Sequence, residues 1–248
     1  MNPVAGCAEV LLHVTWRSGQ LARPQLRVYL LRQVSAAGID VMPLLALLAV
    51  IGGTGVLVGT AQLLGLDNQL GLQASLIFLW LEFAPLLAAL VLVARSSGLM
   101  AAEVALMRLH NEFESLERLH IPPRDFVLLP RVLGAGVAAA VTTAWMQVLS
   151  LGGGLVLGSA LHGFSAAEQG DRILDLAQPW FIAAGVAKAF AFGLLSAAVA
   201  CHQGLHAPRV PGAGPNAAMV AVGQGVAAVF LFDAFCGVVT YLLMRSSG

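Results

Sequence analysis

Five long apolar runs constrain the fold of this 248-residue chain more than any other feature. About 20 consecutive apolar residues in a helix are enough to cross the hydrocarbon core of a bilayer. Backbone groups in lipid must be hydrogen-bonded internally, and no run alternates apolar and polar residues as a barrel strand does, so each run predicts an α-helix. The predicted transmembrane helices cover residues 41–66, 72–94, 126–157, 179–201 and 216–244.

The overall composition agrees with a membrane protein. Hydrophobic residues make up 58% of the chain and charged residues only 10%, whereas a soluble domain carries about 25% charged residues. The formal net charge is zero, so no global field favours nucleic acid as a partner. We therefore predict an all-α integral membrane protein that forms a single transmembrane domain over residues 1–248.

The arginines predict the orientation of the chain in the membrane, because cytoplasmic loops carry an excess of basic residues. The short link between the first two predicted spans has no arginine. The links after spans three and four have only Arg172 and Arg209, respectively. This pattern places the N-terminus and the central segment in the cytoplasm and, with five spans, the C-terminus outside. The arginines on the cytoplasmic side are Arg17, Arg23, Arg27 and Arg32 before the first span and Arg95, Arg108, Arg118, Arg124 and Arg131 around the central segment.

The segment 20–38 precedes the first span and mixes apolar residues with arginines. Leu26, Tyr29, Leu30 and Gln33 recur at helical spacing, which predicts an amphipathic helix in the cytoplasmic interface. A plain juxtamembrane helix that serves only topology is the alternative.

The central segment 100–121 concentrates charge between spans two and three. Apolar residues recur along it at steps of four and three, which predicts one amphipathic helix ended by Pro122. Charged pairs four residues apart, such as Glu114 with Arg118, support that helix. The residues leave two interpretations open: a solvated connecting helix, or a docking element for a soluble partner. The apolar stripe consists of Ala102, Leu106, Leu109, Phe113 and Leu116.

Three charged residues, Glu82, Lys188 and Asp233, lie within predicted spans. A charge near the bilayer centre costs about 2.5–3.5 kcal/mol on insertion scales, so such residues face protein or water. One interpretation is that Lys188 pairs with Asp233 or Glu82 and holds the helices together. The other is that Glu82 lines a binding cavity.

Sequence motifs of enzymes are absent from the chain. There is no GxxxxGK[ST] phosphate loop, no HExxH and no GxSxG. The stretch CHQGLH brings together Cys201, His202 and His206 without a nearby carboxylate, so a metal site is not predicted. We expect no cofactor and no metal, and any ATP must be bound and hydrolysed by a separate subunit.

The stretch ARSSGLMAAEVALMRLHNEFESLERLHIPPRDFVLLPRVLGAG resembles the signature of MlaE-type permeases, the membrane subunits of ABC systems that move lipids together with MCE proteins. Upstream, LEFAPLLAALVLVARSSG and GTGVLVGTAQLL are similar to further family segments. The chain departs from the family pattern at Leu81 and Phe113, where the family has arginine and glutamine. The resemblance is carried by Arg95, Gly98, Ala102, Glu103, Met107, Glu114, Leu116, Glu117, Ile121, Pro123, Pro130 and Arg131, with Lys188, Gly204 and Asp233 downstream.

The resemblance implies a homodimeric permease in the bacterial inner membrane, with a periplasmic C-terminus, that moves phospholipid or a related lipid. Its partners would be a P-loop ATPase, an MCE-domain protein and a STAS-domain protein. Glu82, Pro85 and Gln62 would line a lipid cavity near the external side. The coupling helix would meet the ATPase through Glu103, Leu106, Met107, Leu109, Phe113, Glu114, Leu116 and Glu117.

Two other functions remain open at the level of sequence. A membrane scaffold could dock a cytoplasmic partner without transport. An intramembrane enzyme that modifies lipid would need a constellation of histidine, serine or carboxylate side chains inside the spans.

Overall fold

A computed structural model describes residues 7, 9–12, 34–35, 38, 41–64, 69–120, 122–162 and 165–246. Within these residues every regular element is a helix, which confirms the all-α prediction. The described part of the chain contains five helical stretches long and apolar enough to cross a membrane: Met42–Thr60, Gln69–Leu109, Phe126–Ala160, Pro179–His206 and Ala213–Thr240. The predicted interfacial helix 20–38 falls almost entirely outside the described residues.

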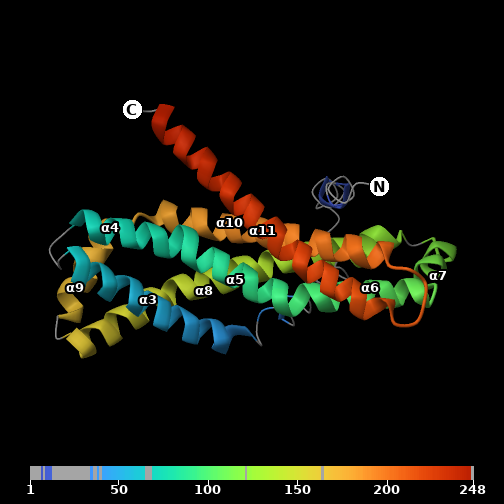
Figure 1. Ribbon diagram of the computed structural model, residues 1–248, viewed down its shortest axis with the longest axis horizontal. Helices are drawn as coiled ribbons and strands as arrows, with labels where there is room; N and C mark the ends of the chain where they lie inside the picture. The colour runs from blue at the N-terminus through green and yellow to red at the C-terminus, as the bar shows by residue number, and fades with distance from the viewer. Residues whose placement is uncertain are drawn as a thin grey trace. The chain divides into compact units, whose positions relative to one another are not determined.

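The helices follow one another along the chain as Figure 1 shows. The second span is continuous through α4, η3, α5, η4 and α6, where η3 and η4 are π-helical turns. The described elements are α3 (Met42–Leu64), α4 (Gln69–Phe78), η3 (Leu79–Phe83), α5 (Ala84–Leu92), η4 (Val93–Ser97), α6 (Gly98–Leu109), α7 (Glu112–Arg118), η5 (Arg124–Leu128), α8 (Leu129–His162), α9 (Ala166–Leu176), α10 (Pro179–His206) and α11 (Ala213–Ser246).

The chain divides into two compact units. The first unit comprises Met1–Ala37, Ala89–Ala138 and Phe190–Gly248, and the second comprises Gly38–Ala88 and Ala139–Ala189. The helices α5, α8 and α10 contribute residues to both units.

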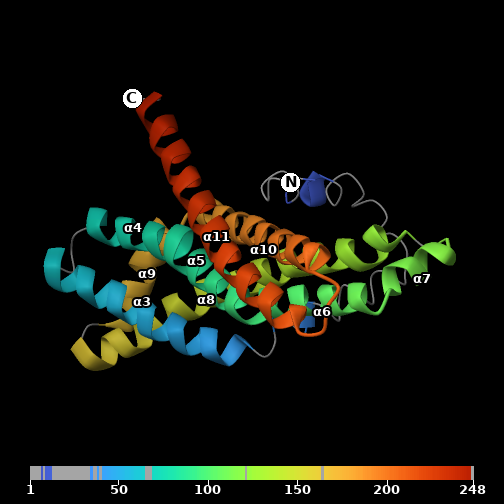
Figure 2. The same cartoon turned by 45° about the vertical axis from the view of Figure 1, so that its right-hand side comes forward.

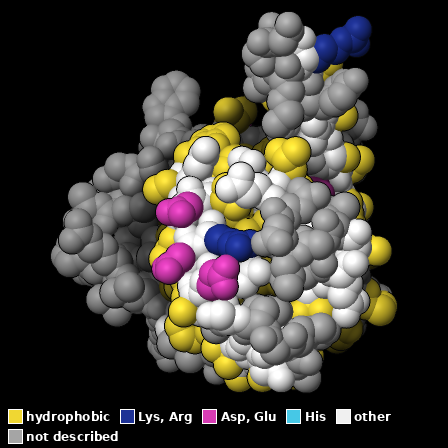
Figure 3. All heavy atoms as spheres, turned by 90° about the vertical axis from the view of Figure 1, so that its left-hand side faces the viewer, with side chains coloured by type: hydrophobic (Ala, Val, Ile, Leu, Met, Phe, Trp, Pro, Cys, Tyr) yellow, Lys and Arg dark blue, Asp and Glu magenta, His cyan; other side chains and the backbone are white. Residues whose placement is uncertain are grey.

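The second unit contains a short helix that the sequence analysis did not predict, α9. Ser165 caps its N-terminus by accepting a hydrogen bond from the Glu168 backbone N–H. Its apolar side carries Ile173, which is buried in a cluster with Leu76, Leu79 and Trp80. Figure 3 faces the side of Figure 1 where α9 lies and shows acidic and basic side chains grouped together. The exposed acidic residues of α9 are Glu168, Asp171 and Asp175.

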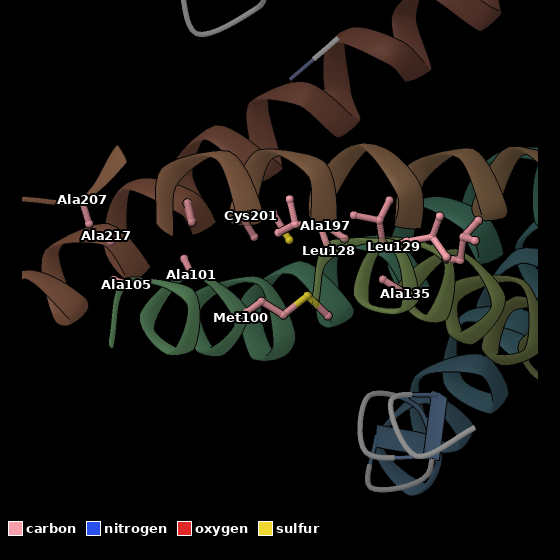
Figure 4. Close-up of a cluster of buried hydrophobic side chains, with 14 of the residues drawn as sticks. Met100, Ala101, Ala105, Leu128, Leu129, Ala135, Ala197, Cys201, Ala207 and Ala217 are labelled. Carbon is pink, nitrogen blue, oxygen red and sulfur yellow. The ribbon is translucent and has the colours of Figure 1, made fainter. Parts of the chain in front are cut away.

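The first unit is built around α6 and α11, which lie side by side in Figures 1 and 2. Its core is made mainly of small side chains, as the close-up in Figure 4 shows. Small residues let membrane helices approach closely, so that packing contacts replace the hydrophobic effect as the source of association. At Gly204 of α10 an added Cβ would lie 2.7 Å from the Ala101 carbonyl oxygen. The helices therefore meet backbone to backbone at this point.

Candidate functional site

An ion pair inside the membrane-spanning part of the second unit joins two of the predicted charged residues. Lys188 Nζ, on α10, lies 2.6 Å from Glu82 Oε2, on η3. Lys188 is the buried partner, with 9% of its side chain exposed, whereas 42% of the Glu82 side chain is exposed. Of the two partners considered for Lys188 from the sequence, the structure shows Glu82. The pair holds a buried ammonium group and presents a carboxylate at a surface of this unit.

The π-helical turn η3 supplies backbone acceptors to the same place. In η3 the Ala84 N–H donates to the Leu79 carbonyl, five residues back. Two carbonyls within this turn accept hydrogen bonds from side chains: Leu81 O from Lys188 Nζ at 3.2 Å and Trp80 O from Gln147 Nε2 at 3.0 Å. Backbone groups at membrane depth must find partners inside the protein, and π-helical turns are often found at functional sites.

Gln147 is a residue that the sequence analysis did not select. It is buried in α8, and its Nε2 donates to Trp80 O and, at 3.5 Å, to Ile182 O. It therefore connects η3, α8 and α10 within the second unit. Gly185 of α10 packs directly against the Trp80 carbonyl and the Gln147 amide, which leaves no room for a side chain. A single amide in the apolar run TTAWMQVLSL was the signal in the sequence.

The other residues predicted for the lipid cavity occupy different environments. Pro85 is buried in α5, in the turn that follows Glu82. Gln62 is exposed in the last turn of α3. Asp233 is partly buried in α11 and belongs to the first unit. The structure brings Glu82 and Lys188 together as neighbours within the second unit.

The central segment differs from the single helix predicted over residues 100–121. The chain forms two helices, α6 and α7, with a break at His110 and Asn111. Asn111 adopts a left-handed conformation with φ 56°. Asparagine tolerates this conformation better than other residues with a side chain. The short α7 then ends near His120, which also has a positive φ of 59°.

The apolar stripe predicted for this segment is not its buried face. On α6 the buried residues are Met100, Ala101, Val104 and Ala105, with Leu106 48% exposed. Ala101 and Val104 lie against Gly204 of α10. The stripe was selected by the spacing of apolar residues, whereas the packing of α6 favours small side chains. Leu109 and Phe113 are partly buried, and Glu114 and Glu117 are exposed.

Arg131 anchors the start of α8 to α6 in the first unit. Its side chain is only 8% exposed, and its Nη2 lies 3.1 Å from Glu103 Oε2. The same nitrogen lies 3.8 Å from the Met107 sulfur. A buried guanidinium needs a partner of opposite charge, and Glu103 provides it. Glu103 and Met107, both predicted coupling residues, therefore also fix the geometry of the segment.

A pocket of about 320 Å³ opens between α6, α7, η5 and the start of α8. Its walls are mostly apolar, with Arg131 at one side and Glu112 at another. Of the predicted coupling residues, Met107 and Leu116 line it. The full lining is Met107, Glu112, Ser115, Leu116, Leu119, Phe126, Val127 and Arg131.

Two further contacts tie the central segment to the turn between α10 and α11. Arg108 Nη1 donates to the carbonyl of Leu205 and, at 3.3 Å, to that of Ala207. Arg209 Nη2 lies 3.1 Å from Glu114 Oε1, with both side chains about half exposed. The spacing in the sequence instead predicted that Glu114 pairs with Arg118. Spacing along one helix could not reveal partners almost a hundred residues away.

The arrangement is suited to binding and transmission of movement. Among the described residues no group of three or more histidine, cysteine, aspartate or glutamate side chains is placed to hold a metal ion. The second unit contains an ion pair between candidate membrane spans, and the first unit contains a set of cross-connected helix ends.

Comparison with known proteins identifies the kind of permease that the chain resembles. The family described as Permease MlaE matches residues 30–239. A probable ABC transporter permease protein of Synechocystis is 26% identical over 167 residues, which cover 67% of this chain and 62% of the relative. A probable ABC transporter permease protein of Rickettsia conorii is 24% identical over 200 residues, covering 76% of this chain and 74% of the relative.

A chloroplast protein is also similar. Protein TRIGALACTOSYLDIACYLGLYCEROL 1 of Arabidopsis thaliana is 25% identical over 142 residues, which cover 57% of this chain and 40% of that protein. The aligned region thus spans less than two thirds of both the Synechocystis and the Arabidopsis relatives.

Proposed function

The chain belongs to the MlaE permease family, and we propose that this membrane subunit of an ABC transporter moves phospholipid or a related lipid. Permease subunits of such transporters are not enzymes, and ATP is hydrolysed by a partner subunit. The name of the Arabidopsis relative contains that of a glycolipid, which supports a lipid substrate here.

The observation that carries the proposal is the Glu82–Lys188 pair between the second and fourth candidate spans. An ion pair with one half-exposed carboxylate suits the polar headgroup of a lipid better than an entirely apolar solute. A headgroup phosphate can compete with Glu82 for the Lys188 ammonium, because charge-assisted hydrogen bonds to phosphate and carboxylate are similar in kind. Glu82, Pro85 and Gln62 would line the lipid cavity, with Lys188 as its buried cation.

The ATPase would dock on the central segment. We place α7 and the end of α6 at the cytoplasmic surface, because the arginines around this segment predict that side. The contact residues would be drawn from Glu103, Leu106, Met107, Leu109, Phe113, Glu114, Leu116 and Glu117. The pocket lined by Leu116 and Met107 would bind an apolar side chain of the ATPase.

The remaining partners follow from the same proposal. An MCE-domain protein would exchange lipid on the external side of a bacterial inner membrane, and a STAS-domain protein would join the ATPase. The N-terminus would be cytoplasmic and the C-terminus periplasmic. A homodimer is part of the same proposal, and its interface would use exposed apolar surface of α11, which includes Phe230, Leu231 and Phe235.

Lipid transfer by the reconstituted complex tests the proposed function. The permease, its ATPase and the lipid carrier would be placed in vesicles, and ATP-dependent transfer of a fluorescent phospholipid would be followed. We expect Glu82→Gln and Lys188→Met each to reduce transfer at least tenfold, because each removes one charge of the pair. Asp171→Asn, which removes an exposed carboxylate on α9, is the matched control and should leave transfer unchanged.

Normal transfer by both variants would contradict the role of the pair. A complex that assembles and hydrolyses ATP but transfers no lipid, even with the wild-type chain, would favour the scaffold function instead. Native mass spectrometry of the purified permease provides a second measurement, in which co-bound lipid and a dimeric mass are expected.

A further inference from the structure

The turn between α10 and α11, residues 207–212, is short and held in one shape, and residues 208–212 are exposed. Pro208 and Pro211 restrict its backbone, and Gly212 adopts a φ of 89° that favours glycine. The turn is closed by hydrogen bonds from Val210 N to Pro208 O and from Ala213 N to Val210 O. Val210 is 53% exposed. An exposed aliphatic side chain on a rigid turn is a surface that a protein partner can contact without ordering a flexible loop.

Arginine side chains attach this turn to the central segment. Arg209, within the turn, pairs with Glu114 of α7 at 3.1 Å. Arg108, at the end of α6, donates to the carbonyls of Leu205 and Ala207 at the C-terminal end of α10. A cation is favourable there because the last carbonyls of a helix lack partners within the helix. The turn and α7 therefore form one continuous surface within the first unit.

Packing behind this surface joins the ends of four spans. The buried cluster of the first unit includes residues of α6, η5, α8, α10 and α11, such as Ala101, Leu128, Leu133, Ala200 and Ala217. Gln203 of α10 donates to Gln224 of α11 at 2.5 Å. A force applied to the surface is thus carried to α10 and α11 as well as to α6 and α8.

We propose that the turn 207–212 is a second contact for the ATPase, held beside α7 by Arg209 and Arg108. The ATPase then moves spans four and five together with spans two and three. This inference rests on the proposed function, in which α7 is the first contact. Glu112, Glu114 and Glu117 of α7, together with the exposed Arg118 and Arg209, give this surface charges of both signs, which suit a partner segment with complementary charged residues.

Site-specific photo-crosslinking in the assembled complex tests the contact. A photoreactive amino acid would be placed at Val210 in the turn, at Leu119 directly after α7, and at Leu174 on α9. Leu119 and Leu174 are each 69% exposed. Leu174 serves as the negative control, because the arginine pattern predicts that its link lies on the external side. We expect crosslinks to the ATPase from Val210 and Leu119 and none from Leu174.

The outcomes separate this inference from the proposed function. Crosslinks from Leu119 without any from Val210 would overturn the second contact and leave the proposed function intact. Absence of crosslinks from both positions would contradict ATPase docking on the central segment itself. Crosslinks from Val210 alone would support the turn as a contact and remove α7 as the first one.

Charge exchange tests how the turn is attached. Arg209→Glu places two carboxylates opposite each other, and we expect it to lower the amount of lipid transferred per ATP hydrolysed at least threefold. The ATPase should still copurify, because an exposed ion pair contributes little to folding. The double variant Glu114→Arg with Arg209→Glu restores the pair and should recover at least half of the wild-type ratio. No change in the single variant, or no recovery in the double variant, would overturn the role of this pair.

Discussion

At the scale of single residues, the Glu82–Lys188 pair shows how a membrane span accommodates charge. Lys188 has its ammonium surrounded by a carboxylate and a backbone carbonyl, while Glu82 keeps almost half of its side chain exposed. The two partners are therefore unequal. Removal of Glu82 takes the negative charge away from beside a buried cation, whereas removal of Lys188 leaves an anion that can turn outward.

This asymmetry predicts unequal losses of stability. Glu82→Gln should destabilise the purified protein by about 1–2 kcal/mol, less than the 3–5 kcal/mol typical of breaking a fully buried pair, because Glu82 is partly exposed. Lys188→Met should cost less, since it replaces a buried charge with an apolar chain of similar length. Thermal unfolding in detergent would compare the two, and equal losses would argue against the asymmetry.

At the scale of elements, the break at Asn111 defines α7 as a separate helix. A left-handed residue costs about 1–2 kcal/mol when it has a β-carbon and less for asparagine or glycine. Without that conformation, α6 would continue straight through residue 111, and Glu114 would lose its position opposite Arg209.

We therefore expect Asn111→Gly to preserve the break and Asn111→Ala to weaken it. The alanine variant should lower lipid transfer per ATP hydrolysed, while the glycine variant should remain close to wild type. Equal behaviour of the two variants in the reconstituted transfer assay would mean that the break does not matter for coupling.

The elements also show what the sequence could predict. The five spans were found because each apolar run is long enough to cross a bilayer on its own, and Pro179 and Pro122 lie near the predicted ends. The break at Asn111 was not predicted, because the periodic pattern of apolar residues continues through a single residue of unusual φ. The helix α9 was not predicted because it is short and polar, although the SAAE sequence at 165–168 has the spacing of a capping box.

The candidate site was only partly predictable for a related reason. Glu82 and Lys188 stood out as charges in apolar runs, but the sequence allowed Lys188 to pair with either of two acids. Gln147, Arg108 and Arg209 gained their partners from distant segments, and no local spacing encodes those contacts.

At the scale of the whole molecule, each unit depends on close approach of its helices at small residues. In the first unit Gly204 of α10 lies against the backbone of α6, whereas Gly223 of α11 has open space around the position of a Cβ. The two glycines therefore differ in what they permit, although both lie in membrane-spanning helices.

Gly204→Val should destabilise the protein by about 1–3 kcal/mol, because extra atoms in a packed interface force the backbones apart. Gly223→Val is the control and should have little effect on the monomer. Thermal unfolding of both variants checks the prediction, and a stable Gly204→Val protein would show that α6 and α10 can separate without cost.

The buried position of Lys188 has a practical consequence, because it is the only lysine in the chain. An amine-directed reagent applied to the folded protein meets no accessible side-chain amine in the described helices, since 9% of the Lys188 side chain is exposed. Acylation of Lys188 by such a reagent would thus record the moments when the ammonium leaves Glu82. The rate of Lys188 acylation would therefore report how often the Glu82–Lys188 ion pair opens.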